Sequence, residues 1–327
     1  MTAISAAGFG VLAVEILGVR FLGPYFGVSL YLWSALISVT LVALCVGYFA
    51  GGWLADRGAG TPALGAVLLL AALCLAPAPW LRTPLVLGLE PMGMRVSALL
   101  SAAVLFGPSL TLLGSVTPLA VKLCIRQPDQ VGWHTGVLSA ASTLASLAGA
   151  LATGYVLIPC FGPARVLAGV GLTLVAAALA CLPLRTWPLG CAVGLGLLVT
   201  PRVPGPDQGL LAVRHSSYGE IRVWERNGQR HLIIDGGAHT VVESATLRSL
   251  YGYVNVLELC DRFFRTPGRA LVLGLGGGSV VRWLDEAGWS VEAVEVDPVV
   301  LEVARGYFGL QAEVHVSDAR RFLEQSG

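Results

Sequence analysis

The sequence predicts a bundle of membrane-spanning helices followed by a small α/β domain with a parallel sheet. First, 55% of the 327 residues are hydrophobic and only 13% are charged, whereas soluble domains carry about 25% charged residues. Second, residues 1–210 hold 14 charged side chains and residues 211–327 hold 27. Third, a glycine-rich turn lies between a predicted strand and a predicted helix near residue 275. The chain is therefore expected to pass from membrane to water near residue 210.

Composition also excludes several classes of protein. High hydrophobicity excludes intrinsic disorder, and seven cysteines in 327 residues are too few for a disulfide scaffold. A net charge of +1 predicts no nucleic-acid partner. Six cysteines lie in or beside apolar segments and Cys260 lies in the polar part, with no Cys-x-x-Cys motif and no Cys/His cluster. No metal site is predicted.

Seven apolar segments approach the length of a membrane span, which is about 20 residues. They are 3–23, 29–53, 63–80, 97–121, 136–160, 165–184 and 186–201. The last is short and contains Pro188, so it either crosses or lies at the interface. We expect residues 1–201 to form a transmembrane domain of six to seven spans.

The first apolar segment contains two charged residues, Glu15 and Arg20. Charged groups inside a membrane are costly, so they mark either a structural pair or a proton or substrate pathway. Arg20 could also extend its long side chain to the interface. The fifth segment carries small residues at helix-packing spacing, which suit either packing within the bundle or a face between copies of the chain. These residues are Ser142, Ala145, Ser146, Gly149, Ala150, Thr153 and Gly154.

The soluble part is expected to begin after a linker of Pro, Gly and polar residues at 202–210. Residues 211–268 then form a lead-in region. Asn227-Gly228 between two β-rich runs predicts a hairpin over about 220–234. A helix is expected over about 243–262.

Residues 269–327 read as part of a Rossmann-like domain of the type found in S-adenosylmethionine-dependent methyltransferases. A short apolar strand leads into a glycine-rich turn and a helix, then into a second strand that ends in acids, which is a βαβ pattern. A third short strand follows. The expected elements are strand 270–273, turn 274–278, helix 279–286, strand 290–295 and strand 312–316.

The glycine turn and the acid after it are the candidate ligand-binding residues. Glycines at 274, 276 and 278 let a ligand approach the backbone, and the next helix offers free N–H groups. Glu295 lies about 20 residues downstream, where an acid can bind ribose hydroxyls. The dinucleotide fingerprint requires glycine at the position of Ser279. Gly274-x-Gly276-x-Gly278 matches S-adenosylmethionine-type nucleoside binders instead.

Two further acids follow strand ends. Asp318 comes after the third strand, where loops of open α/β sheets carry ligands, so it could accept a hydrogen bond from an adenine amino group. It could also cap the helix that begins near Ala319. Asp297 precedes Pro298, which favours an N-cap role.

Segments from nearly the whole chain resemble the spermidine synthase (polyamine aminopropyltransferase) family. In the soluble part these are SSYGEIRVW, LIIDGG, VLGLGGG, VEAVEVDPVVLEVARGYF and VHVSDARRFL. Three apolar segments resemble the membrane-integrated branch of that family: VEILGVRFLGPYFGVSLYLWS, GSVTPLAVKL and GVLSAASTLASLAGALATGYVLIPCFG.

This resemblance implies decarboxylated S-adenosylmethionine or S-adenosylmethionine as co-substrate, with no metal. By resemblance, Gly274, Gly276 and Gly278 would line it, Glu295 would hold its ribose and Asp318 its adenine. An aminopropyl group would pass to a polyamine or related amine near Asp235 and His239.

The chain also departs from the family pattern. The family's aspartate-rich catalytic segment follows a fourth strand, and no such segment precedes Gly327, so no catalytic residue is assigned. His239 stands where the family has a glutamine, Gly277 stands where it often has an aspartate, and no Tyr-His-Glu stretch occurs around Tyr251. We therefore expect either a C-terminally truncated member of the family, whose parallel sheet has an open edge, or a sheet that something else completes.

Two other functions remain open at this stage. One is a transporter or membrane sensor with a nucleoside-binding appendage, since GGWLADRGAG resembles a loop of major-facilitator transporters. The other is an S-adenosylmethionine-dependent methyltransferase. For each we expect an integral membrane protein of the bacterial inner membrane, as a homo-oligomer, with the soluble domain in the cytosol where S-adenosyl compounds are made.

Overall fold

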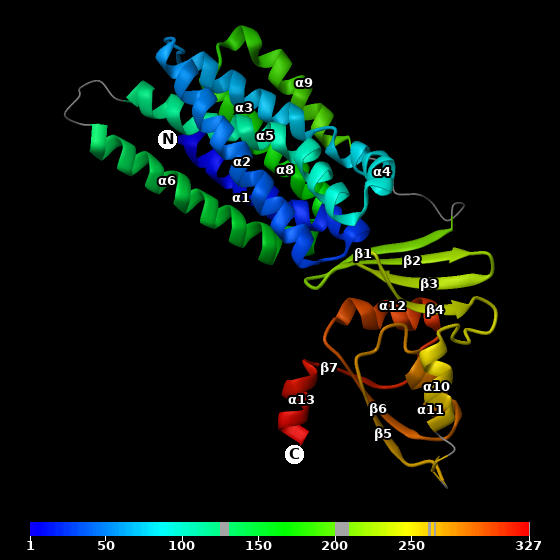
Figure 1. The fold of residues 1–327 in the computed structure, drawn as a ribbon. Helices are drawn as coiled ribbons and strands as arrows, with labels where there is room; N and C mark the ends of the chain where they lie inside the picture. Colours follow the sequence, from blue (N-terminus) through cyan, green and yellow to red (C-terminus); the bar gives the residue numbers. More distant parts are fainter. Residues whose placement is uncertain (125–130, 200–208, 261–262, 265, 327) are drawn as a thin grey trace. The chain divides into compact units, whose positions relative to one another are not determined.

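The computed structural model describes residues 1–124, 131–199, 209–260, 263–264 and 266–326. The chain folds into two compact units, Met1–Arg202 and Val203–Gly327. The first is helical and the second contains two small sheets (Figure 1). Most of the predicted linker, residues 202–208, lies outside the described residues.

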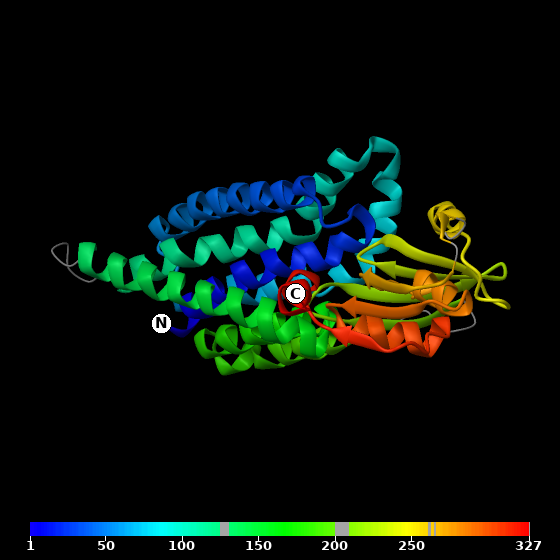
Figure 2. The same cartoon turned by 90° about the horizontal axis from the view of Figure 1, so that it is seen from below.

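Nine α-helices form the described part of the first unit (Figures 1 and 2). Helix α1 contacts α2, α3, α5, α6 and α8, so it lies at the centre of the bundle. Its Phe21 packs edge-on against Phe106 of α5, and both rings are fully buried. The helices are α1 (Thr2–Phe26), α2 (Leu30–Asp56), α3 (Thr61–Leu75), α4 (Ala78–Leu89), α5 (Met94–Cys124), α6 (Val131–Ala152), α7 (Ile158–Phe161), α8 (Pro163–Cys181) and α9 (Trp187–Leu198).

Five helical segments among the described residues are long and apolar enough to cross a membrane. A sixth is obtained if α3 and the helical stretch Ala78–Met92, bent by 54° at their junction, count as one span. The last predicted segment contains α9, a helix of 12 residues. A helix of that length is about 18 Å long, which is shorter than the hydrocarbon core of a membrane, about 30 Å thick. The five segments are Thr2–Phe26, Leu30–Asp56, Met94–Cys124, Val131–Phe161 and Pro163–Cys181.

Small residues of the fifth predicted segment pack against α1. The Ser146 hydroxyl donates a hydrogen bond to the Gly8 carbonyl at 2.8 Å. A Cβ built on Gly149 would lie 2.5 Å from the Phe9 carbonyl oxygen, and one on Gly8 would lie 2.4 Å from the carbonyl oxygen of Ser142. Helices α1 and α6 therefore touch through their backbones, as small residues allow.

The second unit begins with a four-stranded antiparallel sheet in the order β1-β2-β3-β4. Its strands are β1 (Leu210–His215), β2 (Glu220–Arg226), β3 (Gln229–Ile234) and β4 (Gly237–Glu243). The predicted Asn-Gly hairpin is confirmed as β2–β3, with φ of 53° at Asn227 and 73° at Gly228. Asp235 and Gly236, with φ of 46° and 83°, make a second two-residue turn that extends the sheet to β4.

The helix expected over 243–262 is wrong in its first part. Helix α10 spans Gly252–Cys260, and residues 261 and 262 of the predicted helix lie outside the described residues. Before it the chain makes a tight turn, in which Leu247 has φ of 58° and Val242 bridges Ser249. The Leu247 N–H donates to the Glu243 carbonyl and the Glu243 N–H donates to the Arg248 carbonyl. This local pairing satisfies the backbone without a helix.

The rest of the unit has three parallel strands in the order β5-β6-β7. The elements are β5 (Arg269–Leu273), α11 (Ser279–Glu286), β6 (Ser290–Glu295), α12 (Pro298–Phe308), β7 (Val314–Val316) and α13 (Ala319–Ser326). The strand, turn, helix and strand predicted over 270–295 are confirmed. Leu271 and Leu273 on β5 are exposed, as is Val316 on β7, so apolar side chains of this sheet remain uncovered.

Helix α12 contributes to two hydrophobic clusters, and Figure 1 shows it below the antiparallel sheet. Val300, Val303 and Phe308 pack with the antiparallel strands. Leu301 and Ala304 pack with residues of β6 and the segment after β5. The helix therefore holds the two sheets of this unit in one arrangement, and that arrangement positions the candidate site.

Candidate functional site

The glycine-rich loop follows the carboxyl end of β5. Its Gly274, Gly276 and Gly278 have φ of 87°, 54° and 78°, which side-chain-bearing residues rarely adopt. Gly278 is the N-cap of α11, and the Gly274 N–H donates to the Val294 carbonyl at 2.9 Å. The three predicted glycines therefore adopt positive φ angles in a loop that turns the chain from strand β5 into helix α11.

Glu295 ends β6 beside this loop. Its Oε2 accepts a hydrogen bond from the Leu275 N–H and its Oε1 accepts one from the Asp297 N–H, both at 2.9 Å. The residue is only 9% exposed. A carboxylate has about four lone-pair sites, so both bonds leave capacity for further donors such as hydroxyls. Glu295 thus links the glycine loop to the end of the neighbouring strand.

Asp318 follows the end of β7, next to Glu295. The Ser317 N–H donates to the Glu295 carbonyl at 3.0 Å. Asp318 is exposed, and its Oδ1 accepts a hydrogen bond from the Arg321 N–H at 3.0 Å. The side chain therefore caps α13, while its exposure leaves the carboxylate accessible to a ligand.

Asp297 caps α12, as the sequence suggested. Its Oδ1 accepts from the Val299 N–H at 2.9 Å. Its Oδ2 accepts from the Ser216 hydroxyl at 2.5 Å, and Asp297 is 3% exposed. Ser216 lies between β1 and β2, so this bond ties the antiparallel sheet to the start of α12.

The two predicted substrate residues lie in different surroundings. His239 is exposed on β4, and its carbonyl oxygen would lie 4.0 Å from a Cβ at Gly276. Asp235 sits in the β3–β4 turn, where its Oδ1 accepts from the Glu220 N–H at 2.9 Å. The structure therefore brings the backbone of His239 near the glycine loop, whereas its imidazole Nε2 would lie 3.6 Å from a Cβ on Gly237. Asp235 is tied to the beginning of β2.

Thr240 of β4 is a site residue that the sequence did not point to. Its hydroxyl accepts a hydrogen bond from the Gly277 N–H at 2.8 Å, and Thr240 is only 4% exposed. The two residues are 37 positions apart in the chain. Sequence reasoning carries no signal for such a contact, because only the packing of β4 on the loop brings them together.

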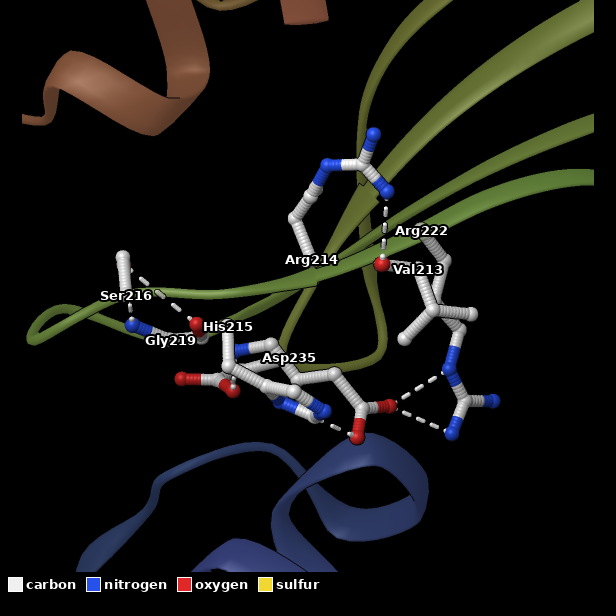
Figure 3. A network of polar contacts seen from close by, with 8 residues as sticks. Val213, Arg214, His215, Ser216, Gly219, Arg222 and Asp235 are labelled. Atoms are coloured by element: carbon white, nitrogen blue, oxygen red, sulfur yellow. Dashed lines mark hydrogen bonds and ion pairs between the residues drawn. The ribbon is translucent and has the colours of Figure 1, made fainter. Parts of the chain in front are cut away.

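Glu220, whose N–H bonds the predicted substrate residue Asp235, is another polar residue that the sequence did not point to. It is buried at the start of β2, and Arg222 Nε donates to its Oε1 at 2.5 Å. His215 Nδ1 lies 3.8 Å from its other carboxylate oxygen. Figure 3 shows Arg222, His215 and Asp235 of this polar network. A buried carboxylate is tolerated here because it is paired.

Tyr251 is tied to β4 as well. Its hydroxyl donates to the Ala238 carbonyl at 2.6 Å, and its ring lies 5.8 Å from that of Tyr253. Burial, and then the neighbouring Tyr251, raise the pKa of Tyr253 above its usual value.

The two charged candidates of the first apolar segment lie apart from these residues in the sequence, on α1. Glu15 and Arg20 are both partly buried. Five residues apart on a helix, they do not share one face. Among the described residues, no group of three or more His, Cys, Asp or Glu side chains is placed to hold a metal ion.

Comparison with known proteins gives distant relatives of one kind. No family model matches the chain. A protein of Vibrio vulnificus (strain CMCP6) named polyamine aminopropyltransferase is 37% identical over 86 residues, which is 24% of this chain and 29% of that protein. Proteins of that name from Mycobacterium tuberculosis (strain H37Rv) and Mycobacterium bovis (strain AF2122/97) are 30% identical over 222 residues, which is 59% of this chain and 41% of theirs. The chain thus spans less than half the length of these curated relatives.

Proposed function

We propose that this protein is a membrane-bound, spermidine synthase-like transferase. It would move an aminopropyl group from decarboxylated S-adenosylmethionine to a polyamine or a related amine. One observation carries the proposal: the glycine loop, Glu295 and Asp318 lie at the carboxyl ends of three adjacent parallel strands. Open α/β sheets bind ligands at that edge. The names of the distant relatives support the same reaction class.

Each site residue has a role that fits its geometry. In the proposal, the glycines of the loop let the nucleoside approach the backbone. Glu295 accepts hydrogen bonds from the ribose hydroxyls, and Asp318 accepts one from the adenine amino group. Glu295 and Asp297 are buried and already bonded to backbone N–H groups. They therefore hold the site in shape and do not take the proton from the amine. His239, exposed on β4, would face the amine.

The proposed reaction joins the amine nitrogen to the aminopropyl carbon next to the sulfonium. The carbon–sulfur bond breaks, its electrons go to sulfur, and methylthioadenosine leaves. The attacking amine loses one proton. Since the sulfonium is already a good leaving group, the protein mainly has to hold the two reactants in line.

The helical unit would anchor this site to the bacterial inner membrane. Its long apolar helices are compatible with a membrane protein. The nucleoside site would lie in the cytosol, since S-adenosyl compounds are made there. A homo-oligomer is part of the same proposal.

Calorimetric titration of the detergent-solubilised protein tests the proposal. We expect saturable binding of decarboxylated S-adenosylmethionine and methylthioadenosine, because the Leu275 and Asp297 N–H groups hold the Glu295 carboxylate beside the glycine loop. Tighter binding of S-adenosylmethionine than of its decarboxylated form would favour methyl transfer instead. If none of the three binds, the nucleoside site is refuted and the transport function becomes the better proposal.

The Asp318→Asn variant separates the two roles of Asp318. Asparagine caps helices about as well as aspartate, so the unfolding midpoint should not change. The variant's amide can donate to the O6 of inosine, which a carboxylate cannot. We expect the wild type to prefer methylthioadenosine over methylthioinosine in competition titrations. In the variant, the ratio of the two affinities should be about tenfold smaller.

Asp285→Asn is the control for this experiment, because Asp285 is an exposed aspartate on α11. It should keep the wild-type preference. An Asp318→Asn variant that also keeps it would show that Asp318 only caps the helix.

A further inference from the structure

Strand β4 contacts the glycine loop through the side chain of Thr240. The Gly277 N–H donates to the Thr240 hydroxyl at 2.8 Å, and both residues are buried. A buried N–H that loses its partner is costly, so this bond favours the conformation that the loop has here. The loop is therefore held from outside the parallel sheet as well as by Glu295.

The same side chain fills the space beside the loop. A Cβ built on Gly277 would lie 2.7 Å from Cγ2 and 3.0 Å from Cβ of Thr240. A Cβ on Gly276 would lie 3.1 Å from the Thr240 hydroxyl oxygen. These approaches are too close for a side chain at Gly277 without a shift of the strand. Thr240 therefore packs directly on the bare backbone of the loop.

Thr240 is itself held firmly. It pairs with Leu232 in the β3–β4 ladder, and Leu232 is fully buried in the cluster that includes Val303 and Phe308 of α12. Thr240 is thus anchored to the core of this unit, at the point where the register of the β3–β4 ladder shifts. Precise sites depend on such support from packed elements.

We propose that Thr240 is a positioning residue of the nucleoside site, an inference that rests on the proposed function. Its hydroxyl accepts the hydrogen bond from the Gly277 N–H and keeps the glycine loop in the conformation that would bind the nucleoside. The antiparallel sheet thereby controls the affinity of a site that is built on the parallel sheet.

The test compares two substitutions of Thr240 in the full-length protein. Thr240→Val keeps the shape but removes the hydrogen-bond acceptor, and Thr240→Ser keeps the acceptor. We expect Thr240→Val to weaken methylthioadenosine binding about tenfold and to speed hydrogen exchange of the Gly277 amide. Thr240→Ser should restore both to within about threefold of the wild type. Thr246→Val, at a threonine whose hydroxyl bonds the exposed Glu243, is the control and should match the wild type.

Two results would overturn the inference. One is wild-type affinity and exchange in Thr240→Val, and the other is equal loss in Thr240→Val and Thr240→Ser. If the wild type binds no nucleoside, the proposed function fails, but the exchange rate of the Gly277 amide still decides whether Thr240 holds the loop. If Thr240→Val does not fold, Thr240→Ser alone decides. Wild-type binding and wild-type exchange of the Gly277 amide in Thr240→Ser would support the role of the hydroxyl. Weak binding together with fast exchange in Thr240→Ser would contradict it.

Discussion

Glu295→Gln is expected to abolish measurable nucleoside binding. The Glu295 carboxylate receives two backbone N–H groups, from Leu275 and from Asp297, and it is nearly buried. A glutamine side chain has one oxygen and one NH₂ group, so one of the two N–H groups would face another donor. Hydrogen bonds to charged groups contribute about 1.5–3 kcal/mol, and a buried N–H left without an acceptor costs about 1–3 kcal/mol.

The Glu295→Gln substitution should loosen the glycine loop more than the rest of the unit. Leu275 lies in the glycine loop, so releasing its N–H loosens the segment that would receive the nucleoside. We expect affinity for methylthioadenosine to fall at least about a hundredfold, which corresponds to about 2.7 kcal/mol. Titration calorimetry measures this, and hydrogen exchange of the Leu275 amide reports the local opening.

Glu292→Gln provides a matched control on the same strand. Glu292 is partly exposed, with His315 Nε2 at 3.1 Å and Arg269 at 3.9 Å from its carboxylate oxygens. Surface ion pairs of this kind contribute about 0–1 kcal/mol. The control should bind nucleoside like the wild type. Equal behaviour of the two glutamine variants would show that the Glu295 carboxylate does not hold the loop.

Local patterns were enough to predict much of the second unit. Asn227-Gly228 identified its hairpin, because only a few residue pairs adopt two successive positive φ angles. The alternation of strand, glycine turn and helix placed α11 and β6 to the residue. Glu295 and Asp318 could be expected near each other, since parallel strands end at one edge.

Contacts between distant segments could not be predicted in this way. The partner of Gly277 is Thr240, and the partner of Asp297 is Ser216, which lies 81 residues away. Neither pair has a local signature. The helix expected from residue 243 failed because the segment around Leu247 pairs with itself in a turn. The Asp235-Gly236 turn did carry the same hairpin signal as Asn-Gly, and it could have revealed β4.

In the first unit, apolar length predicted the helices but not which of them touch. The sequence pattern pointed to the small residues of α6, yet the shortest approach to a glycine among the described residues is between α2 and α5. A Cβ built on Gly47 would lie 2.2 Å from the Thr111 carbonyl oxygen, and one on Gly51 would lie 2.4 Å from that of Ser115. Glycines on α2 thus let the two helix backbones meet, as small residues do in membrane bundles.

Gly51→Ala is therefore expected to destabilise the helical unit strongly. The new methyl group would also lie 2.7 Å from the Ser115 Cα, so both close contacts are with backbone that has no rotamer to change. Overpacking of this kind typically costs about 1–3 kcal/mol, and we expect the upper end because neither helix can yield locally. Unfolding of the detergent-solubilised protein by heat or denaturant would show the lower midpoint.

Gly52→Ala is the neighbouring control, since a Cβ at Gly52 meets nothing within 4 Å. Alanine favours helix by about 1 kcal/mol over glycine, so this variant should be as stable as the wild type or more stable. The two variants add the same methyl group one residue apart on one helix. Because propensity acts equally on both, the difference between their midpoints measures the contact with α5 alone. Equal midpoints would mean that α2 and α5 do not approach as closely as this structure has them.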